Sequence, residues 1–499
     1  MNAEMEIRFY NTLTRQFEPF RPLTAELVTM YSSGPTAYDF ASVSTFRSFL
    51  FADLLRRFLE SSGFDVHQIM NISDVCPLRE HSALAGKNAD KNRFATWKSQ
   101  DNRTSGEVEN PSKAADYFTR TFLEDGRTLG LRVANEFPNN VPKATLFIAE
   151  MQQMIAKFLE QGLAYVGSDG VVYFGVEAFP RFGQLSGNTL EALRVGSGSR
   201  IEIDNQSCKR HPADFILWKP DPKHIIKWTS PWGDGYPGRF IECPTIARCV
   251  FRTDVLDIRT GGEDLIFPDH ECEIAQACAA TGNDVFSRFW MHARSLRVQG
   301  EKISKPTATL FTIRNILSGK VTGTPVHPAV LRMELIKSHY RAHGNFTSKG
   351  LADTAHIVRR LTEQGKRLRE ACGAVPKQID PAEHAVVRAF LQALANDLNV
   401  SEAMAVVHAW MWSPCPDAAE AYGVLLTLDQ VLGVWELAAS DCEEQVSECD
   451  VTASLCTMID EARRAHQFSA ADAHRQRLIQ LGYEVRSSSD GTSAKKKLA

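Results

Sequence analysis

The pattern that most constrains the fold lies in residues 26–73. An apolar stretch, LVTMY, leads into the turn Gly34-Pro35, and the helical stretch RSFLFADLLRRFLE is followed by a second apolar stretch, FDVHQIM. Two short apolar runs joined by a helical crossover are typical of a βαβ unit, whose strands pair in parallel. The sequence therefore predicts an α/β chain with a parallel sheet near its start.

The turn before this helix, SVST at residues 42–45, carries hydroxyl groups and has no glycine, histidine or lysine. Nucleotide-binding sheets place phosphates at such junctions, because free backbone N–H groups and the helix dipole point at the ligand. Ser42, Ser44 and Thr45 are therefore candidate phosphate ligands. The alternative is that they only cap the helix.

Length and composition exclude several classes of protein. A chain of 499 residues exceeds what one hydrophobic core usually spans, so we expect two or three domains. No apolar run approaches the roughly 20 residues that a membrane span needs, so we expect no membrane partner. The net charge of −4 provides no overall basic field. This argues against a DNA partner and leaves room for a local RNA-binding face.

The N-terminus and the cysteines indicate the compartment. The first twenty residues include three glutamates and no apolar core, unlike a signal or transit peptide. The eleven cysteines contain no CxxC pair, and an odd number does not complete a disulfide framework. We therefore expect a cytoplasmic chain with reduced thiols. We also expect a monomer.

Periodicity places further elements along the chain. Residues 144–162 have helical spacing and a glycine stop, and AYVGSDGVVYFGV after them predicts a hairpin that turns at Asp169-Gly170. Residues 254–279 return to strand and helix, and the chain after about residue 327 is almost wholly helical. The remaining expectations are a mobile loop at 76–115, a packed loop at 212–232 and a disordered tail at 487–499.

Four polar segments could carry chemistry. They are GPTAYD with the SVST turn, PGRFIECP at 237–244, GGEDLIFPDHECE at 261–273 and GEKISKP at 300–306. Two lysines on a loop suit the stabilisation of a phosphoryl group that gains charge, and the alternative is a solvated basic turn. Asp264 after two glycines could bond a ribose hydroxyl or an ammonium group, or it could cap a helix.

Together and in this order, these segments resemble the signature segments of cysteinyl-tRNA synthetases, which are class I synthetases with a Rossmann-type catalytic core. The resemblance runs from MYSSGPTAYDF through NISDV, SPWGDGYPGRFIEC, GGEDLIFPDHECEIAQ and GEKISK to HPAVLRMELIKSHYRAHGNF and ADAHRQRLIQLGYEV. It implies an α/β fold in which a Rossmann-type core with an inserted subdomain precedes an all-helical, stem and anticodon-binding-like domain.

The resemblance also implies the domain bounds. The catalytic domain would span residues 1–325, with the inserted subdomain at about 118–225. A helical stem would follow at 326–410. Residues 411–499 would form a C-terminal helical, tRNA-binding-like region that ends in a disordered tail.

The same resemblance implies ATP with Mg²⁺ as cofactor, an amino acid as substrate, and tRNA or a tRNA-like acceptor as partner. The implied catalytic residues lie in the family's lysine loop, and the implied ATP and substrate ligands lie around the sheet edge. The catalytic residues are Lys302, Ser304 and Lys305; the ATP ligands are Ser42, Ser44, Thr45, Gly262, Asp264 and Lys305; the substrate ligands are Ser33, Thr36, Arg239, Glu242 and Asp264.

The chain departs from the family at the ATP signature and at the metal site. The SVST turn stands where the family has HIGH, so both phosphate-binding imidazoles are absent, and each lost donor costs about 3–4 kcal/mol of transition-state stabilisation. The family binds zinc through two cysteines, a histidine and a glutamate. Ser33, Cys243, Asp269 and Glu273 stand at these positions. Cys243, Asp269 and Glu273 remain candidate ligands, but a serine hydroxyl is a poor zinc ligand, which argues against a tight zinc site.

Three hypotheses about function follow. The first is an ATP-dependent ligase that activates an amino acid as its adenylate and passes it to tRNA or another acceptor. The second is a catalytically inactive paralogue that serves as a scaffold, since SVST lacks the imidazoles. The third is a tRNA-independent amide ligase, since Arg239-Phe240 replaces the family's Trp-His pair. The helical C-terminal half favours the first over the third.

Overall fold

The computed structural model describes residues 5–75, 111–194, 206–302, 310–373, 375–413, 417–439, 455–463, 465, 467–480, 483–488 and 491–496. The chain divides into two compact units, Met1–Val434 and Trp435–Ala499. Among the described residues, no helix is long and apolar enough to cross a membrane.

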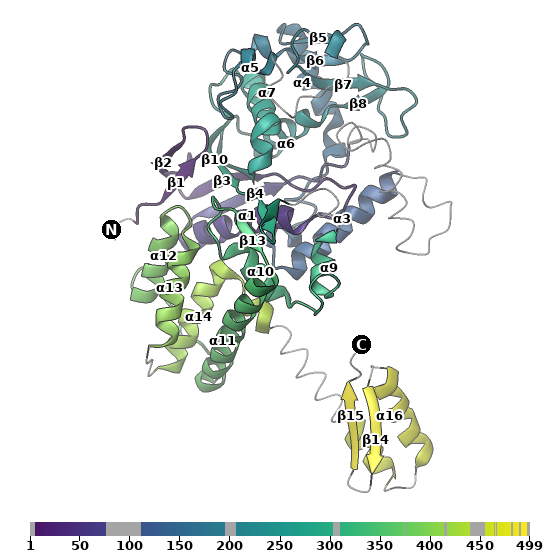
Figure 1. Cartoon of the computed structure of the whole chain (residues 1–499), viewed down its shortest axis with the longest axis vertical. Coiled ribbons are helices and arrows are strands. Elements are labelled where there is room, and N and C mark those ends of the chain that lie inside the picture. Colours follow the sequence, from purple (N-terminus) through teal and green to yellow (C-terminus); the bar gives the residue numbers. More distant parts are fainter. Residues whose placement is uncertain are drawn as a thin grey trace. The chain divides into compact units, whose positions relative to one another are not determined.

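A parallel sheet forms the centre of the first unit (Figure 1). Its strands are β3 (Leu27–Ser32), β4 (Asp65–Met70), β9 (Leu256–Gly262) and β10 (Ser287–Ala293), in the order β10-β9-β3-β4. Helix α1 (Val43–Ser61) makes the crossover from β3 to β4, which confirms the predicted βαβ unit. Because β3 has its crossover partner on one side and β9 on the other, the switch point of the sheet lies between the carboxyl ends of β3 and β9.

A second, antiparallel sheet is inserted between β4 and β9. Its order is β5 (Ala164–Val166), β6 (Val172–Phe174), β7 (Phe215–Pro220) and β8 (Gly235–Pro237). The β5–β6 hairpin confirms the predicted turn, where Gly170 has a φ of +79°. The expectation of a packed loop at 212–232 is wrong for β7, because Phe215 and Trp218 fill the buried face of a strand.

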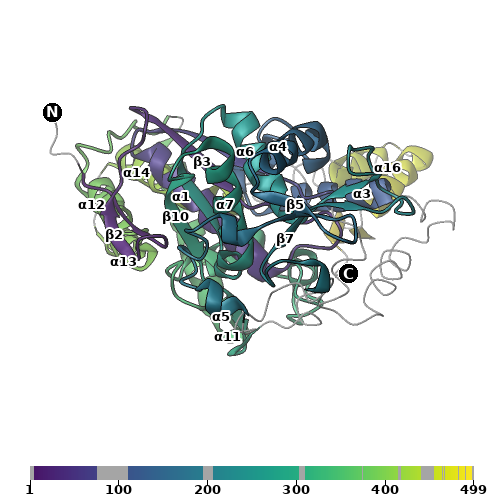
Figure 2. The same cartoon turned by 90° about the horizontal axis from the view of Figure 1, so that it is seen from above.

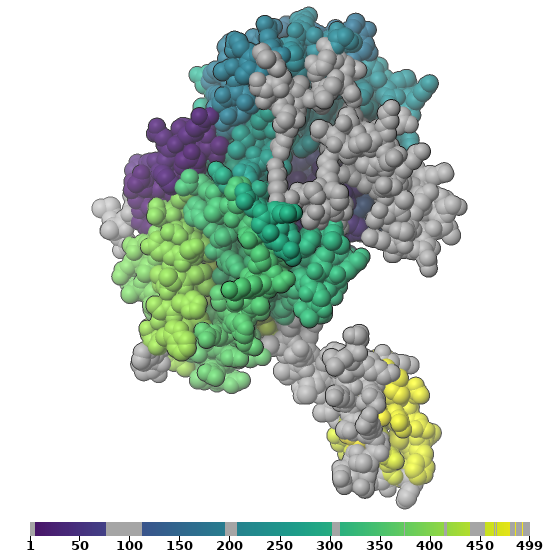
Figure 3. Space-filling model, in the orientation of Figure 1, coloured from purple at the N-terminus to yellow at the C-terminus, as the bar shows by residue number. Residues whose placement is uncertain are grey.

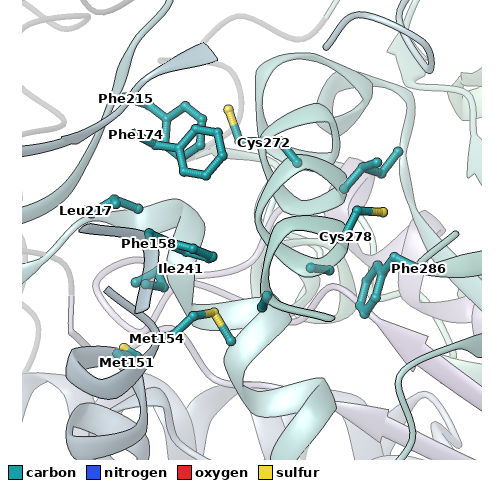
Figure 4. Packing of buried hydrophobic residues seen from close by; sticks show 14 of the residues in the cluster. Met151, Met154, Phe158, Phe174, Phe215, Leu217, Ile241, Cys272, Cys278 and Phe286 are labelled. Atoms are coloured by element: carbon teal, nitrogen blue, oxygen red, sulfur yellow. The ribbon is translucent and has the colours of Figure 1, made fainter. Parts of the chain in front are cut away.

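Three helices join the two sheets. These are α4 (Ile148–Glu160), α6 (Glu242–Phe251) and α7 (Glu271–Thr281), and α4 and α6 lie side by side in both views (Figures 1 and 2). Their apolar faces form one core with the inserted sheet. Figure 4 shows Phe158 of α4 beside Phe174 and Leu217, across from Cys272 and Cys278 of α7. This continuous core stabilises the packing of the insertion against the parallel sheet, because buried apolar area is the main favourable term in folding.

The part of the first unit that follows residue 327 is almost wholly helical, as predicted. It contains α10 (Pro328–Ile336), α11 (Ser348–Cys372), α12 (Ala385–Ala395), α13 (Val400–Met411) and α14 (Ala418–Leu432). Helices α10 and α14 pack against α1, so this region covers the side of the parallel sheet opposite the insertion (Figure 1). The surface of this helical region, coloured green in Figure 3, is continuous. The bounds predicted for the stem and the C-terminal region stay predictions.

Further elements complete the first unit. They are β1 (Arg8–Asn11), β2 (Gln16–Pro19), α3 (Pro111–Thr128), α5 (Leu190–Arg194), β11 (Leu296–Val298), β12 (Glu301–Lys302), α9 (Ile313–Leu317), β13 (Gly344–Phe346), the 3-10 turns Arg132–Asn135, Ala144–Phe147, Val176–Ala178, Gln206–Cys208, Arg239–Ile241 and Glu263–Leu265, and the π-turn Ile266–His270. The loop expected at 76–115 lies mostly outside the described residues. Its last five residues belong to α3, so that part of the expectation is wrong.

The second unit has its own small core. Helix α16 (Phe468–Gln480) packs on the hairpin of β14 (Tyr483–Ser488) and β15 (Gly491–Lys496), and the buried side chains are Ile459, Ala462, Ala471, Leu478 and Val485. The expectation of a disordered tail is wrong for β15. This strand pairs with β14 through backbone groups, which need no apolar side chains, and the Thr492 N–H and hydroxyl donate to Asp460 at 3.0 and 2.6 Å.

Candidate functional site

The candidate site lies at the switch point of the parallel sheet, where ligands bind in open α/β folds. The chain leaves β3 at Ser33, whose N–H donates to the Thr260 carbonyl of β9 at 3.2 Å. Gly34 then passes so close to β4 that a Cβ atom would lie 1.7 Å from the Asn71 carbonyl oxygen. Thr36 forms a parallel bridge with Ser73 beyond β4. The predicted substrate residues Ser33 and Thr36 therefore both lie beyond the carboxyl end of β3, where the chain runs beside the segment that follows β4.

The end of β9 meets the start of α1 at the same edge. A Cβ atom at Gly262 would lie 2.4 Å from Asp264 Oδ1 and 3.3 Å from Ser48 Oγ. There is thus no room for a side chain at Gly262 beside Asp264 and Ser48. The predicted role of Gly262, which is to let the backbone approach a ligand, stays a prediction. Ser48 was not among the predicted residues. Its signal is the spacing of four from Ser44, which puts both hydroxyls on one helix face.

The hydroxyls of the SVST turn have partners within the protein. Ser42 is the N-cap of α1, where its Oγ accepts from the Thr45 N–H at 3.3 Å and lies 3.0 Å from Thr45 Oγ1. Ser44 Oγ accepts from the Leu296 N–H at 3.3 Å, and the Val43 N–H donates to the Phe311 carbonyl at 2.9 Å. The capping interpretation of Ser42 is confirmed. A phosphate-binding role for these hydroxyls stays a prediction.

The lysine loop begins beside this turn. Strand β11 starts at Leu296, the residue bonded to Ser44, and pairs with β12, which ends at Lys302. The backbone of Lys302 is thus anchored close to the start of α1. Ser304 and Lys305 lie outside the described residues, and their predicted roles stay predictions.

The positions that resemble zinc ligands are engaged with other side chains. Glu273 forms a bidentate ion pair with Arg259, with Nε–Oε1 and Nη2–Oε2 distances of 2.9 Å, and neither side chain is more than 3% exposed. Asp269 forms an ion pair with Arg239 at the end of β8. Among the residues that the structure describes, no three His, Cys, Asp or Glu side chains are grouped so as to hold a metal ion.

Cys243 and Ser33 complete this set. Burial raises the pKa of the Cys243 thiol above its ordinary value, so this side chain is a neutral thiol at physiological pH. Its Sγ lies 3.9 Å from Asn71 Oδ1. Ser33 Oγ lies 3.1 Å from His270 Nε2. The two predicted residues are therefore bonded to neutral groups, and the chemistry of the four positions together does not fit a zinc ion.

A chain of hydrogen bonds continues from Ser33 into the core. His270 Nδ1 lies 2.9 Å from His292 Nε2, and His292 Nδ1 lies 2.9 Å from Thr12 Oγ1. Burial, with the nearby charge of Arg259, lowers the pKa of His270 well below its usual value and that of His292 to about 3. Both imidazoles are therefore neutral at physiological pH.

Glu242, predicted to bind substrate, lies at the first turn of α6 and is 1% exposed. Its Oε2 accepts from the Ser73 hydroxyl at 2.6 Å, and its Oε1 has no hydrogen-bond partner in the described part of the chain. Burial raises the pKa of Glu242 to about 8. At neutral pH this side chain is therefore a protonated acid behind the end of β4.

Comparison with known proteins decides the family. Residues 19–356 match the model of the tRNA synthetases class I (C) catalytic domain. A cysteine--tRNA ligase of Salinibacter ruber is 35% identical over 516 residues, which cover 97% of this chain and 97% of that one. This chain belongs to the cysteine--tRNA ligase family. The cysteine--tRNA ligase of Chlamydia pneumoniae is likewise 35% identical, over 504 residues and 98% of each chain.

The predicted resemblance and fold class are thereby confirmed. The structure of a methionyl-tRNA synthetase of Mycobacterium tuberculosis bound by methionyl-adenylate matches with a TM-score of 0.50 and 10% identity, over 84% of this chain and 90% of that one. A second structure of that enzyme in complex with methionyl-adenylate has a TM-score of 0.50 and 12% identity, over 83% and 90%. At these identities the likeness shows a shared class I fold.

Within this member of the cysteine--tRNA ligase family, sequence reasoning missed Arg259, His292 and Ser48. An arginine inside the apolar strand DIRTGG is a signal for a buried ion pair, because a charged side chain is almost never fully buried without a partner. His292 at the end of β10 carries no comparable local signal. Its role depends on the parallel pairing of β9 and β10, which sets it beside Gly261.

Proposed function

We propose that this chain is an ATP-dependent ligase of the cysteine--tRNA ligase type, which activates an amino acid as its adenylate and transfers it to tRNA or another acceptor. The observation that carries the proposal is identity of about 35% to cysteine--tRNA ligases over nearly the whole chain. The convergence of Ser33, Gly262 and Asp264 at the switch point supports it.

In this proposal the amino-acid carboxylate attacks the α-phosphorus of ATP, and the bond to pyrophosphate breaks. Gly262 and Asp264 would hold the ribose or the substrate ammonium at the end of β9. Lys302 and Lys305, with Ser304 between them, would neutralise the charge that develops on the departing pyrophosphate, together with Mg²⁺. Ser42, Ser44 and Thr45 would line the phosphate end.

An acceptor hydroxyl would then attack the carbonyl carbon of the adenylate, with AMP as the leaving group. Helices α11 to α14 support tRNA as the acceptor, because adenylate formation alone needs no such region. In a specific complex with tRNA, lysine and arginine side chains would contact phosphates, so that affinity would fall with salt.

Pyrophosphate exchange with each of the amino acids in turn tests the proposal. We expect exchange with one or a few amino acids. Lys305→Ala should lower its rate by about 100-fold or more, whereas Lys320→Ala, an exposed lysine on another loop, should leave it unchanged. Absence of exchange with every amino acid would end the proposal.

One observation favours a second candidate, a scaffold that does not use nucleotides. The Val43 and Thr45 N–H groups at the start of α1 are bonded to Phe311 and Ser42, so fewer donors face a phosphate. Calorimetry with ATP separates the two candidates. Micromolar affinity for ATP would exclude a scaffold that does not bind nucleotides.

A further inference from the structure

Arg259 occupies a central place among the positions that resemble metal ligands. Its guanidinium is fully buried, binds both carboxylate oxygens of Glu273, and donates to the Thr260 and Tyr31 carbonyls at 2.6 and 3.3 Å. It also lies over the Tyr31 ring at 4.7 Å. The site therefore already contains a cation, the Arg259 guanidinium, which is bonded to a carboxylate and two carbonyl groups of the protein.

This arrangement competes with a metal ion. An ion that used Glu273 would have to release the carboxylate from Arg259 and leave a buried guanidinium without a counter-charge, which is strongly unfavourable. The other positions are engaged too, since Asp269 is paired with Arg239 and Ser33 with His270.

The end of β3 presents a neutral hydrogen-bonding group instead. If the Thr12 hydroxyl donates to His292, His292 donates to His270 and His270 donates to Ser33, so that the Ser33 hydroxyl is free to donate to a ligand. If the direction is reversed, Ser33 Oγ is free to accept. The absence of a side chain at Gly261 makes room for these hydrogen-bonded side chains, because a Cβ atom there would lie 2.6 Å from His270 Cε1.

We propose that the amino-acid site of this chain binds its substrate without a metal ion. Arg259 is the fixed cation that holds Glu273. Ser33 recognises a substrate side chain with a neutral hydrogen-bonding end, and its hydroxyl is oriented by the hydrogen bonds that run through His270 and His292 to Thr12. The proposal rests on the proposed function, since it names the substrate class of that same site. The class is a small amino acid bearing a hydroxyl or amide group, selected by hydrogen bonds and not as a thiolate. Ser33 is a specificity-determining residue, and the two histidines are positioning residues.

The first test is metal content. The full-length protein is dialysed against zinc sulfate, then against metal-free buffer, and its zinc is measured by mass spectrometry. We expect well below one zinc ion per chain, and amino-acid-dependent exchange that is unchanged by a zinc chelator. One retained zinc ion per chain, or exchange that a chelator abolishes and zinc restores, would overturn the proposal.

The second test is selectivity. Ser33→Ala should lower kcat/KM for the amino acid at least about tenfold, the equivalent of one lost hydrogen bond, with KM for ATP unchanged. Ser33→Thr keeps the hydroxyl and should retain most activity. Ser413→Ala, which removes a hydroxyl bonded to a helix carbonyl, is the matched control. Exchange supported by cysteine alone, or full activity in Ser33→Ala, contradicts the proposal.

The two failures are distinguishable. Absence of exchange with every amino acid refutes the proposed function. The zinc measurement tests independently whether the site is free of metal. That measurement uses the unmodified chain, so it does not depend on whether a variant folds.

Discussion

Asp125 on α3 is a buried carboxyl whose protonation is linked to folding. Burial raises its pKa to about 6, although Arg314 lies 2.9 Å away and opposes the shift. Arg314 also bonds the exposed Glu124, so its charge is shared between two carboxylates. Burial therefore outweighs the ion pair at Asp125, and the native state holds the proton more tightly than the unfolded chain does.

This shift predicts a pH dependence. Because the native pKa exceeds the ordinary value of 3.8, the contribution of Asp125 to the free energy of unfolding is complete below about pH 4 and is lost as the pH rises to 6, by roughly 3 kcal/mol in total. Urea unfolding of the wild type and of Asp125→Asn at several pH values measures it. The wild type should lose stability relative to the variant across this window, and parallel curves would contradict the prediction.

At the residue scale, sequence reasoning found groups whose role is local. Ser33 follows β3 directly, and Gly262 and Asp264 lie at and just after the end of β9, so the local pattern places each at the carboxyl end of a strand. The pairing of β3 with β9, which brings them to one sheet edge, is not contained in that pattern. The ion pair of Arg259 and Glu273 joins residues 14 positions apart on different elements, and the His270–His292 contact joins residues 22 apart. Such pairs depend on how α7 and β10 pack, which no local pattern contains.

Helix α1 connects the parallel sheet to the helical region at the scale of elements. At its start, Ser44 binds β11, and one turn later Arg47 donates to the Arg294, His339 and Ala342 carbonyls beyond β10 and α10. Burial lowers the pKa of Arg47 to about 10, so it stays charged at neutral pH. Arg47 is thus committed to joining the sheet to the helical region, and it is not oriented to replace an imidazole at a phosphate.

The start of α1 allows capping and phosphate binding to be separated. Ser42→Ala should lower the free energy of unfolding by about 1 kcal/mol, because the cap is lost. Ser42→Asp should retain wild-type stability, since aspartate caps as well as serine and interacts favourably with the helix dipole. If phosphates approach this turn, the added carboxylate should weaken ATP binding at least about tenfold by like-charge repulsion.

Urea unfolding and ATP calorimetry on the same two variants supply the measurements. ATP affinity of Ser42→Asp equal to that of the wild type would show that phosphates do not approach α1. The predicted ATP role of Ser42, Ser44 and Thr45 would then be wrong, while their capping role would stand.

At the scale of the whole molecule, residues 435–499 form a compact unit with a core of their own. Residues 468–499 carry six lysines and arginines against three acidic side chains, whereas residues 435–467 carry two against eight. This local excess of positive charge suits contacts with phosphates. The resemblance to synthetases predicted a tRNA-binding-like region here, but periodicity alone did not reveal β15.

A chain that ends at Ala439 tests whether amino-acid activation depends on the first unit alone and whether tRNA binding requires the second. Because the sheet, α1 and the lysine loop all precede this residue, we expect the shortened chain to keep its fold and its pyrophosphate exchange within about twofold. Its affinity for tRNA should fall at least about tenfold at fixed salt, since phosphate contacts dominate such binding.

The full-length variant Arg475→Gln/Arg477→Gln, which removes two charges and keeps the unit, should lose part of that affinity and show a shallower salt dependence. Unchanged tRNA binding by the shortened chain would place the acceptor site on α11 to α14, and loss of exchange with an intact circular dichroism spectrum would show that the second unit takes part in catalysis.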